Sequence, residues 1–307
     1  MKVVVYHRTV PNAKNLEKVD VLKHFATGVQ RAHDELIDAT DHQYHDAKVG
    51  VIQGWVGPVQ HTSAHQLLRN TVIQQQLSSN QYVVAIDSNL FLYATPGNPA
   101  HYLRYSFNGV FPNTGIYCDS TPDPVRWQKI SSKLKISLKP YRQQGAHILL
   151  CLQRNSGWSM GNYNVAEWAI NTINALRVHT DRPIVVRAHP GDKTSKDYLS
   201  NFSSLQSKRV TISPSGASFL DDLKNCWAVV NHNSSPAVGA AIEGYPIFVT
   251  DPIRSQCQEI ANTDLLQIES PQMPERQAWV ERLSMFHWDF DELQSGKCWT
   301  HMRQFVR

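Results

Sequence analysis

Two short segments in the second half of the chain combine an apolar run with residues that can bind an anion. The first is the run 183–186, which leads straight into Arg187, His189 and Pro190. Arginine carries a permanent charge and histidine offers a donor near neutral pH, so both suit a phosphate group. We expect these three residues at the carboxyl end of a strand, in contact with a ligand. An ordinary turn histidine bonded to its own backbone is the alternative.

The second segment is the apolar run 228–230, followed by Asn233, Ser234, Ser235 and Pro236. Serine before proline is a common helix start, because serine caps free N–H groups and proline fits the first helical position. In open α/β sheets, ligands bind at the carboxyl ends of strands, where helix N-termini present N–H groups to anions. The two serines therefore fit a plain helix cap and a phosphate site equally, since both use the same helix end.

A third candidate element is the loop that contains Arg154, Ser156 and Gly157, directly after the apolar run 147–152. Glycine in a strand-to-helix loop lets backbone N–H groups approach a diphosphate, and Arg154 adds a positive charge that can bind in bidentate fashion. The same residues would also make an ordinary surface loop. Beside the other two segments, this loop favours a site for a phosphorylated ligand, in particular a nucleotide.

Length and composition are those of a mildly basic soluble protein. The chain has 307 residues, of which 41% are hydrophobic and 18% charged, so we expect one large or two medium domains. No apolar run approaches the roughly 20 residues that span a bilayer, and residues 2–6 resemble a first strand rather than a signal peptide. Five scattered cysteines without a CxxC pattern argue against disulfides and structural zinc, which predicts a cytoplasmic location. The net charge of +4 permits a nucleic-acid partner without requiring one.

Strand and helix patterns alternate along the chain. Strands are predicted at 2–6, 48–53, 82–86, 147–152, 184–187, 210–212, 227–231 and 247–249. Helices are predicted at 16–36, 64–77, 124–134, 165–177, 219–224, 236–243, 276–287 and 290–305. Residues 89–119 are irregular and marked by glycine and proline, which is uncommon unless a segment carries function.

The apolar pattern restarts at residue 147, which indicates a domain boundary near 138–141. The sequence therefore predicts an α/β fold with two Rossmann-like domains that face a cleft. The N-terminal domain, 1–140, would bind the acceptor. The C-terminal domain, 141–307, would bind the nucleotide and carry the tail helices.

The second half resembles the GT-B glycosyltransferases, above all the His-Pro-bearing capsule Kdo transferases and bacterial sialyltransferases. The resemblance covers mainly residues 147–250 and rests on a His-Pro at a strand end, Ser-Ser before a helix and Gly-x-Pro before a strand. It implies a GT-B-like fold and a transferase that uses a nucleotide-sugar donor without an essential metal or other cofactor. It also implies donor contacts at His189, Pro190, Ser234 and Ser235.

One departure from the GT-B pattern concerns the ribose of the donor. Many GT-B enzymes carry a glutamate five residues before the glycine of Gly-x-Pro, where this chain has Gly239. Glu243 lies one turn later on the same helix face and is the candidate replacement. The identity of the donor nucleotide therefore stays open.

The acceptor hydroxyl needs a carboxylate or imidazole to take its proton, if the reaction inverts configuration. Asp87 is the first candidate for this catalytic base, because it follows the apolar run 82–86. His101, Arg104 and Tyr105 are candidate acceptor contacts, with plain loop structure as the alternative. The chain has no Asp-x-Asp motif, no HExxH and no paired histidine spacing, so we predict no catalytic metal.

Two acceptors fit this transferase interpretation. One is a saccharide of the bacterial capsule or envelope. The other, which we favour from the sequence by a small margin, is 5-hydroxymethylcytosine in double-stranded phage DNA. The chain is similar in size to the DNA-glycosylating enzymes of phages, and Arg104 with nearby aromatic residues could contact an extruded base. Basic residues within 126–139 would contact the phosphates of the DNA backbone. The protein would then act in the cytoplasm of the phage's host.

Functions of another class use the same two-domain plan. A sugar-nucleotide epimerase would need a richer set of acidic and histidine groups around one cleft than the sequence shows. A nucleotide-binding protein without catalysis would have little use for a carboxylate at Asp87.

Overall fold

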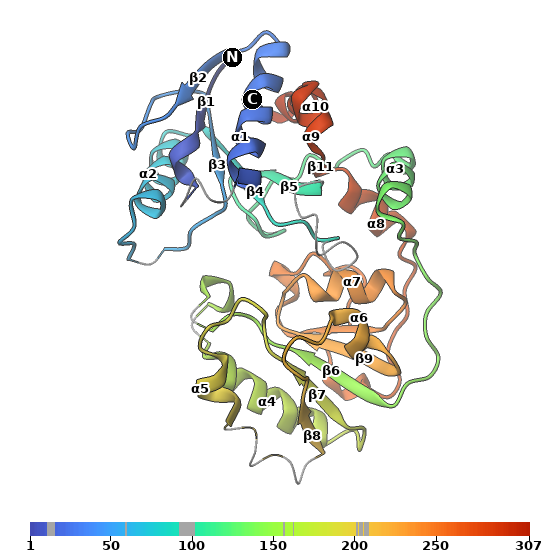
Figure 1. Ribbon diagram of the computed structural model, residues 1–307. Helices are drawn as coiled ribbons and strands as arrows, with labels where there is room; N and C mark the ends of the chain where they lie inside the picture. Colours follow the sequence, from blue (N-terminus) through green and yellow to red (C-terminus); the bar gives the residue numbers. More distant parts are fainter. Residues whose placement is uncertain are drawn as a thin grey trace. The chain divides into compact units, whose positions relative to one another are not determined.

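The chain forms two compact units, shown in Figure 1. The computed structural model describes residues 1–10, 16–58, 60–91, 102–155, 157–161, 163–200, 202, 205 and 209–307. The first unit comprises Met1–Ile130 and Glu281–Arg307, and the second comprises Ser131–Val280. The expected boundary near 138–141 therefore differs from the observed one, and the tail that we expected in the second domain packs in the first unit instead. The chain passes from one unit to the other within helices α3 (Pro124–Leu134) and α8 (Gln277–Ser284).

A six-stranded sheet in the order β11-β5-β4-β3-β1-β2 forms the centre of the first unit. Its strands are β1 (Lys2–Tyr6), β2 (Glu35–Ala39), β3 (Val49–Gln53), β4 (Tyr82–Asp87), β5 (Leu103–Phe107) and β11 (His287–Trp288). Strands β1 to β4 are parallel, whereas β5 and β11 are antiparallel to their neighbours. Strand order reverses between β1 and β3, which makes the carboxyl ends of these strands a topological switch point.

Helices cover both faces of this sheet (Figure 1). One face packs against α1 (Leu16–Arg31), α9 (Phe290–Gln294) and α10 (Lys297–Met302), and the other against α2 (Ala64–Ser78). Helix α9 can pack closely against α1 because Gly28 of α1 has no side chain. A Cβ atom there would come within 2.2 Å of the carbonyl oxygen of Leu293. Helices α9 and α10 thus complete the core of the first unit.

The second unit contains a five-stranded parallel sheet in the order β10-β9-β6-β7-β8. Its strands are β6 (His147–Cys151), β7 (Ile184–Arg187), β8 (Val210–Ile212), β9 (Cys226–Asn231) and β10 (Ile247–Val249). Its remaining helices are α4 (Val165–Arg177), α5 (Ser195–Leu199), α6 (Phe219–Leu223) and α7 (Pro236–Ile242). The strand order is that of a Rossmann fold and reverses between β6 and β9. This switch point is where a Rossmann unit binds ligands.

The helix expected at 276–287 ends at Ser284, and His287 belongs to strand β11 instead. Three further predicted elements differ from the structure for local reasons. The helix expected at 16–36 ends at Arg31, because the chain turns at His33 with a φ of 58° and then forms β2. The stretch 89–119, expected to be irregular, contains β5. The helix expected at 290–305 is divided into α9 and α10 at Gly296, whose φ is 83°.

His287 is a fully buried, neutral histidine in the first unit. Its Nδ1 lies 2.7 Å from the carbonyl oxygen of Leu283, and its Nε2 lies 3.3 Å from the backbone nitrogen of Leu90. The ring must therefore donate from Nδ1 and accept at Nε2. Burial lowers the pKa of His287 to about 3. A second proton on Nε2 would remove the acceptor of the Leu90 N–H group.

The first unit should therefore lose stability in acid through His287. Its folded pKa lies below the ordinary value near 6.5, so the unfolded chain takes up the proton first as pH falls. Between pH 6.5 and 4.5 this linkage costs about 2 kcal/mol. Native-state hydrogen exchange of the β5 amides should show that loss in the wild type and a smaller one in His287→Gln. The exposed-site control His42→Gln should behave like the wild type; equal acid sensitivity of all three proteins would contradict the assignment.

Candidate functional site

Gln153 and Asn233 join the loops at the switch point of the second sheet. Gln153 follows β6, and its Oε1 accepts the backbone N–H of Asn233 at 3.1 Å while its Nε2 donates to Ser159 Oγ at 3.0 Å. The Asn233 amide donates to the Ser159 carbonyl oxygen at 3.1 Å and to Asp251 Oδ2 at 2.9 Å. Both side chains are almost fully buried. These bonds connect the loops that follow β6, β9 and β10 through one buried polar cluster of Gln153, Ser159, Asn233 and Asp251, which we call the polar floor.

Three buried polar atoms beside this floor have no hydrogen-bond partner among the described residues. They are Asn231 Oδ1, His232 Nε2 and Ser234 Oγ. Leaving such an atom unpaired costs about 1–3 kcal/mol, so buried polar atoms are normally bonded to protein, water or ligand. Their position at the switch point favours a ligand site. Of the residues predicted to bind the donor, Asn233 and Ser234 therefore lie at this site.

Ser235 lies at the start of α7 and is exposed. Its side chain makes no capping hydrogen bond, although Pro236 occupies the first helical position as the sequence indicates. The plain helix cap, one of the two interpretations of the serine pair, is therefore not formed by Ser235. Its hydroxyl is accessible to a ligand.

The end of β7 brings together His189, Pro190 and Arg154. His189 Nδ1 accepts the backbone N–H of Gly191 at 3.0 Å, so the neutral ring carries its proton on Nε2. Burial, and then the nearby charge of Arg154, lower the pKa of His189. Arg154 is exposed and close to this turn, because a Cβ atom on Gly191 would lie 2.6 Å from its Nη2. A charged guanidinium and a neutral N–H donor at one strand end form a small anion-binding group.

Asp192 connects the loop of Arg154 to the turn of His189. Its carboxylate accepts the backbone N–H of Asn155 at 3.0 Å, the N–H of Thr194 at 2.9 Å and the hydroxyl of Tyr198 at 2.7 Å. Burial alone would raise the pKa of Asp192, but these hydrogen bonds lower it to about 2. The carboxylate is therefore ionised at neutral pH and binds the two loops together. Gly157 lies in the same loop, its N–H bonded to the Arg154 carbonyl oxygen at 3.1 Å.

Two predicted donor residues have other partners within the second unit. Arg187 forms an ion pair with Asp222 and donates to the Ala217 carbonyl oxygen at 2.9 Å. Glu243 forms an ion pair with Lys139 at the C-terminal end of α7, away from the serines at its start. The prediction that these two residues contact the donor is therefore not supported by their positions. Ser156 lies outside the described residues.

His232, Thr250 and Asp251 form a network that the sequence analysis missed. Thr250 Oγ1 lies 2.7 Å from His232 Nδ1 and accepts the indole N–H of Trp168 at 2.9 Å. Asp251 Oδ2 lies 3.6 Å from His232 Nε2 and 2.6 Å from Nε of Arg254. Burial lowers the pKa of His232, although Asp251 opposes this. The polar pair Thr250–Asp251 directly after a buried strand was the sequence signal.

In the first unit, Asp87 stands at the carboxyl end of β4 as predicted. Its carboxylate forms an ion pair with Arg104 and is partly exposed. Burial alone would lower the pKa of the Arg104 guanidinium, but the negative charge of Asp87 raises that pKa above its ordinary value. Tyr105 points to the opposite face of β5, where it is 1% exposed and stacks on Phe25. Acceptor contact by Tyr105 was therefore a wrong prediction, and His101 lies outside the described residues.

Two further polar groups at this edge were also missed. Arg69 donates from Nε to the Thr9 carbonyl oxygen at 2.9 Å, and burial lowers its pKa to about 10 although Asp87 opposes this. His7, directly after β1, forms a hydrogen-bonded pair with Asp38 of β2. A carboxylate-oriented imidazole is a second group that can accept a proton.

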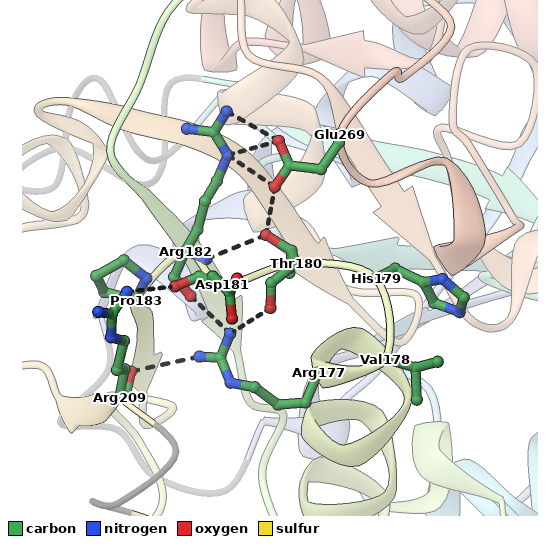
Figure 2. Close-up of a pocket in the computed structure, with 9 residues that line it drawn as sticks. All are labelled: Arg177, Val178, His179, Thr180, Asp181, Arg182, Pro183, Arg209 and Glu269. Carbon is green, nitrogen blue, oxygen red and sulfur yellow. Dashed lines mark hydrogen bonds and ion pairs between the residues drawn. The ribbon is translucent and has the colours of Figure 1, made fainter.

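A hollow of about 700 Å³ in the second unit lies at the opposite edge of its sheet (Figure 2). It is formed by the α4–β7 connection and by Arg209 before β8, at the amino ends of the strands. Arg177 donates to the carbonyl oxygens of Thr180 and Arg182, and Arg182 pairs with Glu269 at 2.9 Å. These guanidinium groups stabilise the connection itself, and no predicted site residue lines this hollow.

The described part of the chain contains no group of three or more histidine, cysteine, aspartate or glutamate side chains placed to bind a metal ion. Among the described helices, none is long and apolar enough to span a bilayer.

No protein-family model and no curated protein matches this sequence. Among solved structures, the chain is similar to the KpsC beta Kdo 2,4 transferase of Thermosulfurimonas dismutans, with a TM-score of 0.59 and 12% identity over 94% of this chain and 91% of that one. The KpsC beta Kdo 2,7 transferase of the same organism gives a TM-score of 0.51 and 12% identity over 99% of both chains. These likenesses establish the fold. The predicted α/β, GT-B-like class with two Rossmann-like units is confirmed.

The anion-binding group at β7 can be tested through Gly191. In Gly191→Ala the new methyl group would lie 2.6 Å from Nη2 of Arg154 and 3.2 Å from Cε1 of His189, so it should push the flexible end of Arg154 aside and crowd the His189 ring. Losing a charged hydrogen bond should weaken binding of inorganic pyrophosphate roughly tenfold in calorimetric titration. Arg154→Ala should show the same loss, and the double variant should lose no more than either single variant. Additive losses would contradict a shared role for the two residues.

Proposed function

We propose that this protein is a glycosyltransferase that moves a sugar from a nucleotide-sugar donor to a saccharide hydroxyl. One observation carries the proposal: buried polar atoms of Asn231 and Ser234 without partners lie at the switch point of a GT-B-like second unit. A Rossmann unit binds nucleotides at this place. Arg154 and His189 on the neighbouring strand ends can bind the donor phosphates.

The donor would lie along the carboxyl edge of the second sheet. In this proposal His189 donates from Nε2 to a phosphate oxygen and Arg154 neutralises part of its charge. Asn231 Oδ1 can accept a sugar hydroxyl, and Ser234 Oγ can donate or accept one. The leaving nucleotide gains negative charge as the glycosidic bond breaks, so fixed donors at its phosphates stabilise that change.

A saccharide acceptor fits the side chains better than DNA does. The DNA interpretation used Arg104 and Tyr105 to hold an extruded base, but Tyr105 is in the core and Arg104 is paired with Asp87. The basic residues Arg126 and Lys129 are both bound to Glu292, so they are not directed at phosphates. The two structural neighbours are named as Kdo transferases, which supports an envelope or capsule saccharide. 5-Hydroxymethylcytosine DNA remains the second acceptor in the screen.

Donor binding is tested by thermal shift against nucleoside mono- and diphosphates and nucleotide sugars. A ligand at 100 times its dissociation constant should stabilise the fold by about 2.7 kcal/mol. His189→Ala should weaken binding of that ligand at least tenfold, because a donor to a charged group is lost. The matched control His179→Ala, at the opposite edge of the sheet, should bind like the wild type. Absence of any shift in the wild type would refute the transferase proposal.

The catalytic base is tested separately by turnover. We propose Asp87 for this role, and removal of a general base lowers turnover by roughly 10²–10⁴-fold. Asp87→Ala should therefore lose turnover with a saccharide acceptor while the donor dissociation constant stays unchanged. Asp38→Asn tests His7 as the alternative base, because it removes the carboxylate that is hydrogen-bonded to His7 and leaves Asp87 in place. Loss of turnover in Asp38→Asn but not in Asp87→Ala would transfer the role to His7.

A protein of another class would give a different result in the same experiments. A sugar-nucleotide epimerase would convert the donor sugar in the absence of any acceptor. A nucleotide-binding protein would show the thermal shift without turnover of any kind. Product analysis with and without acceptor therefore separates the three functions.

A further inference from the structure

Tyr163 is an exposed aromatic residue next to the switch point of the second sheet. It lies between the loop after β6 and the start of α4, and it is 62% exposed. Its ring makes a T-shaped contact with His232, with the centroids 5.8 Å apart and an angle of 75° between the rings. Part of the tyrosine ring is therefore packed on a buried residue, while most of its surface faces solvent.

The residue that supports Tyr163 is held from several sides. Trp168 also contacts His232, at 5.7 Å between the ring centroids, and Thr250 Oγ1 lies 2.7 Å from its Nδ1. His232 Nε2 is buried and without a hydrogen-bond partner among the described residues, with Asp251 at 3.6 Å. Tyr163 thus rests on a fixed imidazole beside the polar floor.

A second exposed apolar side chain lies on the adjoining loop. Ile253, in the turn after β10, is 60% exposed. Its neighbour Arg254 lies against Gly161, since a Cβ atom there would be 3.5 Å from Arg254 Nη2. The turn after β10 is therefore packed against the segment that leads into Tyr163. Isolated exposed apolar residues are common, but here two lie on adjoining loops at one polar site.

The exposed side chains of Tyr163 and Ile253 lie at a different part of the sheet edge from the anion-binding group. Arg154 and His189 meet at the end of β7, whereas Tyr163 and Ile253 lie toward β9 and β10. From β7 to β10 there are three strand spacings, or about 14 Å. The edge thus offers positive charge at one end, hydroxyl-binding atoms in the middle and an aromatic face at the other end.

We infer that Tyr163 is the surface on which the planar base of the donor nucleotide stacks. This inference rests on the proposed function and adds the residue that recognises the base. Every nucleobase has a face that can stack on an aromatic ring, so Tyr163 contributes affinity for a base and selects against sugar phosphates that lack one. Because phosphate binding is assigned to Arg154 and His189, the two contributions can be measured separately.

The experiment measures calorimetric dissociation constants of two probes with wild type, Tyr163→Phe and Tyr163→Ala. The probes are the nucleoside monophosphate selected by the thermal-shift panel and ribose 5-phosphate, which lacks the base. Tyr163→Ala should bind the nucleotide roughly tenfold more weakly, as expected for a lost stacking contact. It should bind ribose 5-phosphate as the wild type does, and Tyr163→Phe should restore nucleotide affinity.

Leu266→Ala is the matched control, because Leu266 is equally exposed in the same unit, on the turn Leu265–Gln267. It should leave both dissociation constants unchanged. Unchanged nucleotide affinity in Tyr163→Ala, or an equal loss for both probes, would overturn the stacking role while the transferase proposal stands. A wild type that binds no nucleotide overturns both.

Discussion

The hydrogen bonds of Asn233 are the constraint on which the second unit's site depends. Helices cover both faces of a parallel sheet, so polar side chains can gather only at its edges. At the carboxyl edge, the backbone N–H of Asn233 binds Gln153 and its side chain binds Asp251. Asp251 in turn contacts Arg254 and lies near His232. Without Asn233, the loops after β6, β9 and β10 would have no common bonded centre.

The two arginines near β7 show how similar charges acquire different roles. Arg187 is the last residue of β7, and its guanidinium is neutralised by Asp222, which also accepts from Ser213. Arg154 lies beyond the end of β6 and is exposed beside His189. The difference follows from position: a strand residue finds partners in the neighbouring elements, whereas a loop residue beyond the edge faces solvent. Charge alone did not distinguish them in the sequence.

Patterns within one element made the core of both sheets predictable. β1, β3, β4, β6 and β9 are continuous apolar runs, and the structure contains all five. β2 is interrupted by Glu35 and Asp38, and β11 has two residues that pair with β5, so neither carries such a run. The return of the tail depends on Gly28 and on the bond from the Trp299 indole to Asp34, contacts between residues far apart in the sequence.

The candidate site was predictable to the extent that its residues follow a strand directly. His189, Asn233 and Ser234 come after apolar runs, which is the pattern that marked them as candidates in the sequence. Gln153 and Asp251 also follow apolar runs, but their hydrogen-bond partners lie in other loops, and the sequence does not show those contacts. Arg104 and Tyr105 show the converse error. In a strand, neighbouring side chains point to opposite faces, so both could not face one ligand once β5 was formed.

The unpaired atoms at the switch point link the fold's stability to ligand binding. Each costs about 1–3 kcal/mol, so three of them are a large fraction of the 5–15 kcal/mol that stabilises a typical domain. Two of these residues are held in place by their neighbours: the Asn231 amide donates to the Ser234 carbonyl oxygen at 2.9 Å, and His232 Nδ1 lies 2.7 Å from Thr250 Oγ1. A ligand that bonds to them removes that cost in the folded state alone. In the proposed transferase, bonding of the donor to these atoms would therefore contribute to its affinity, and selection for that binding would limit the stability of the protein without donor.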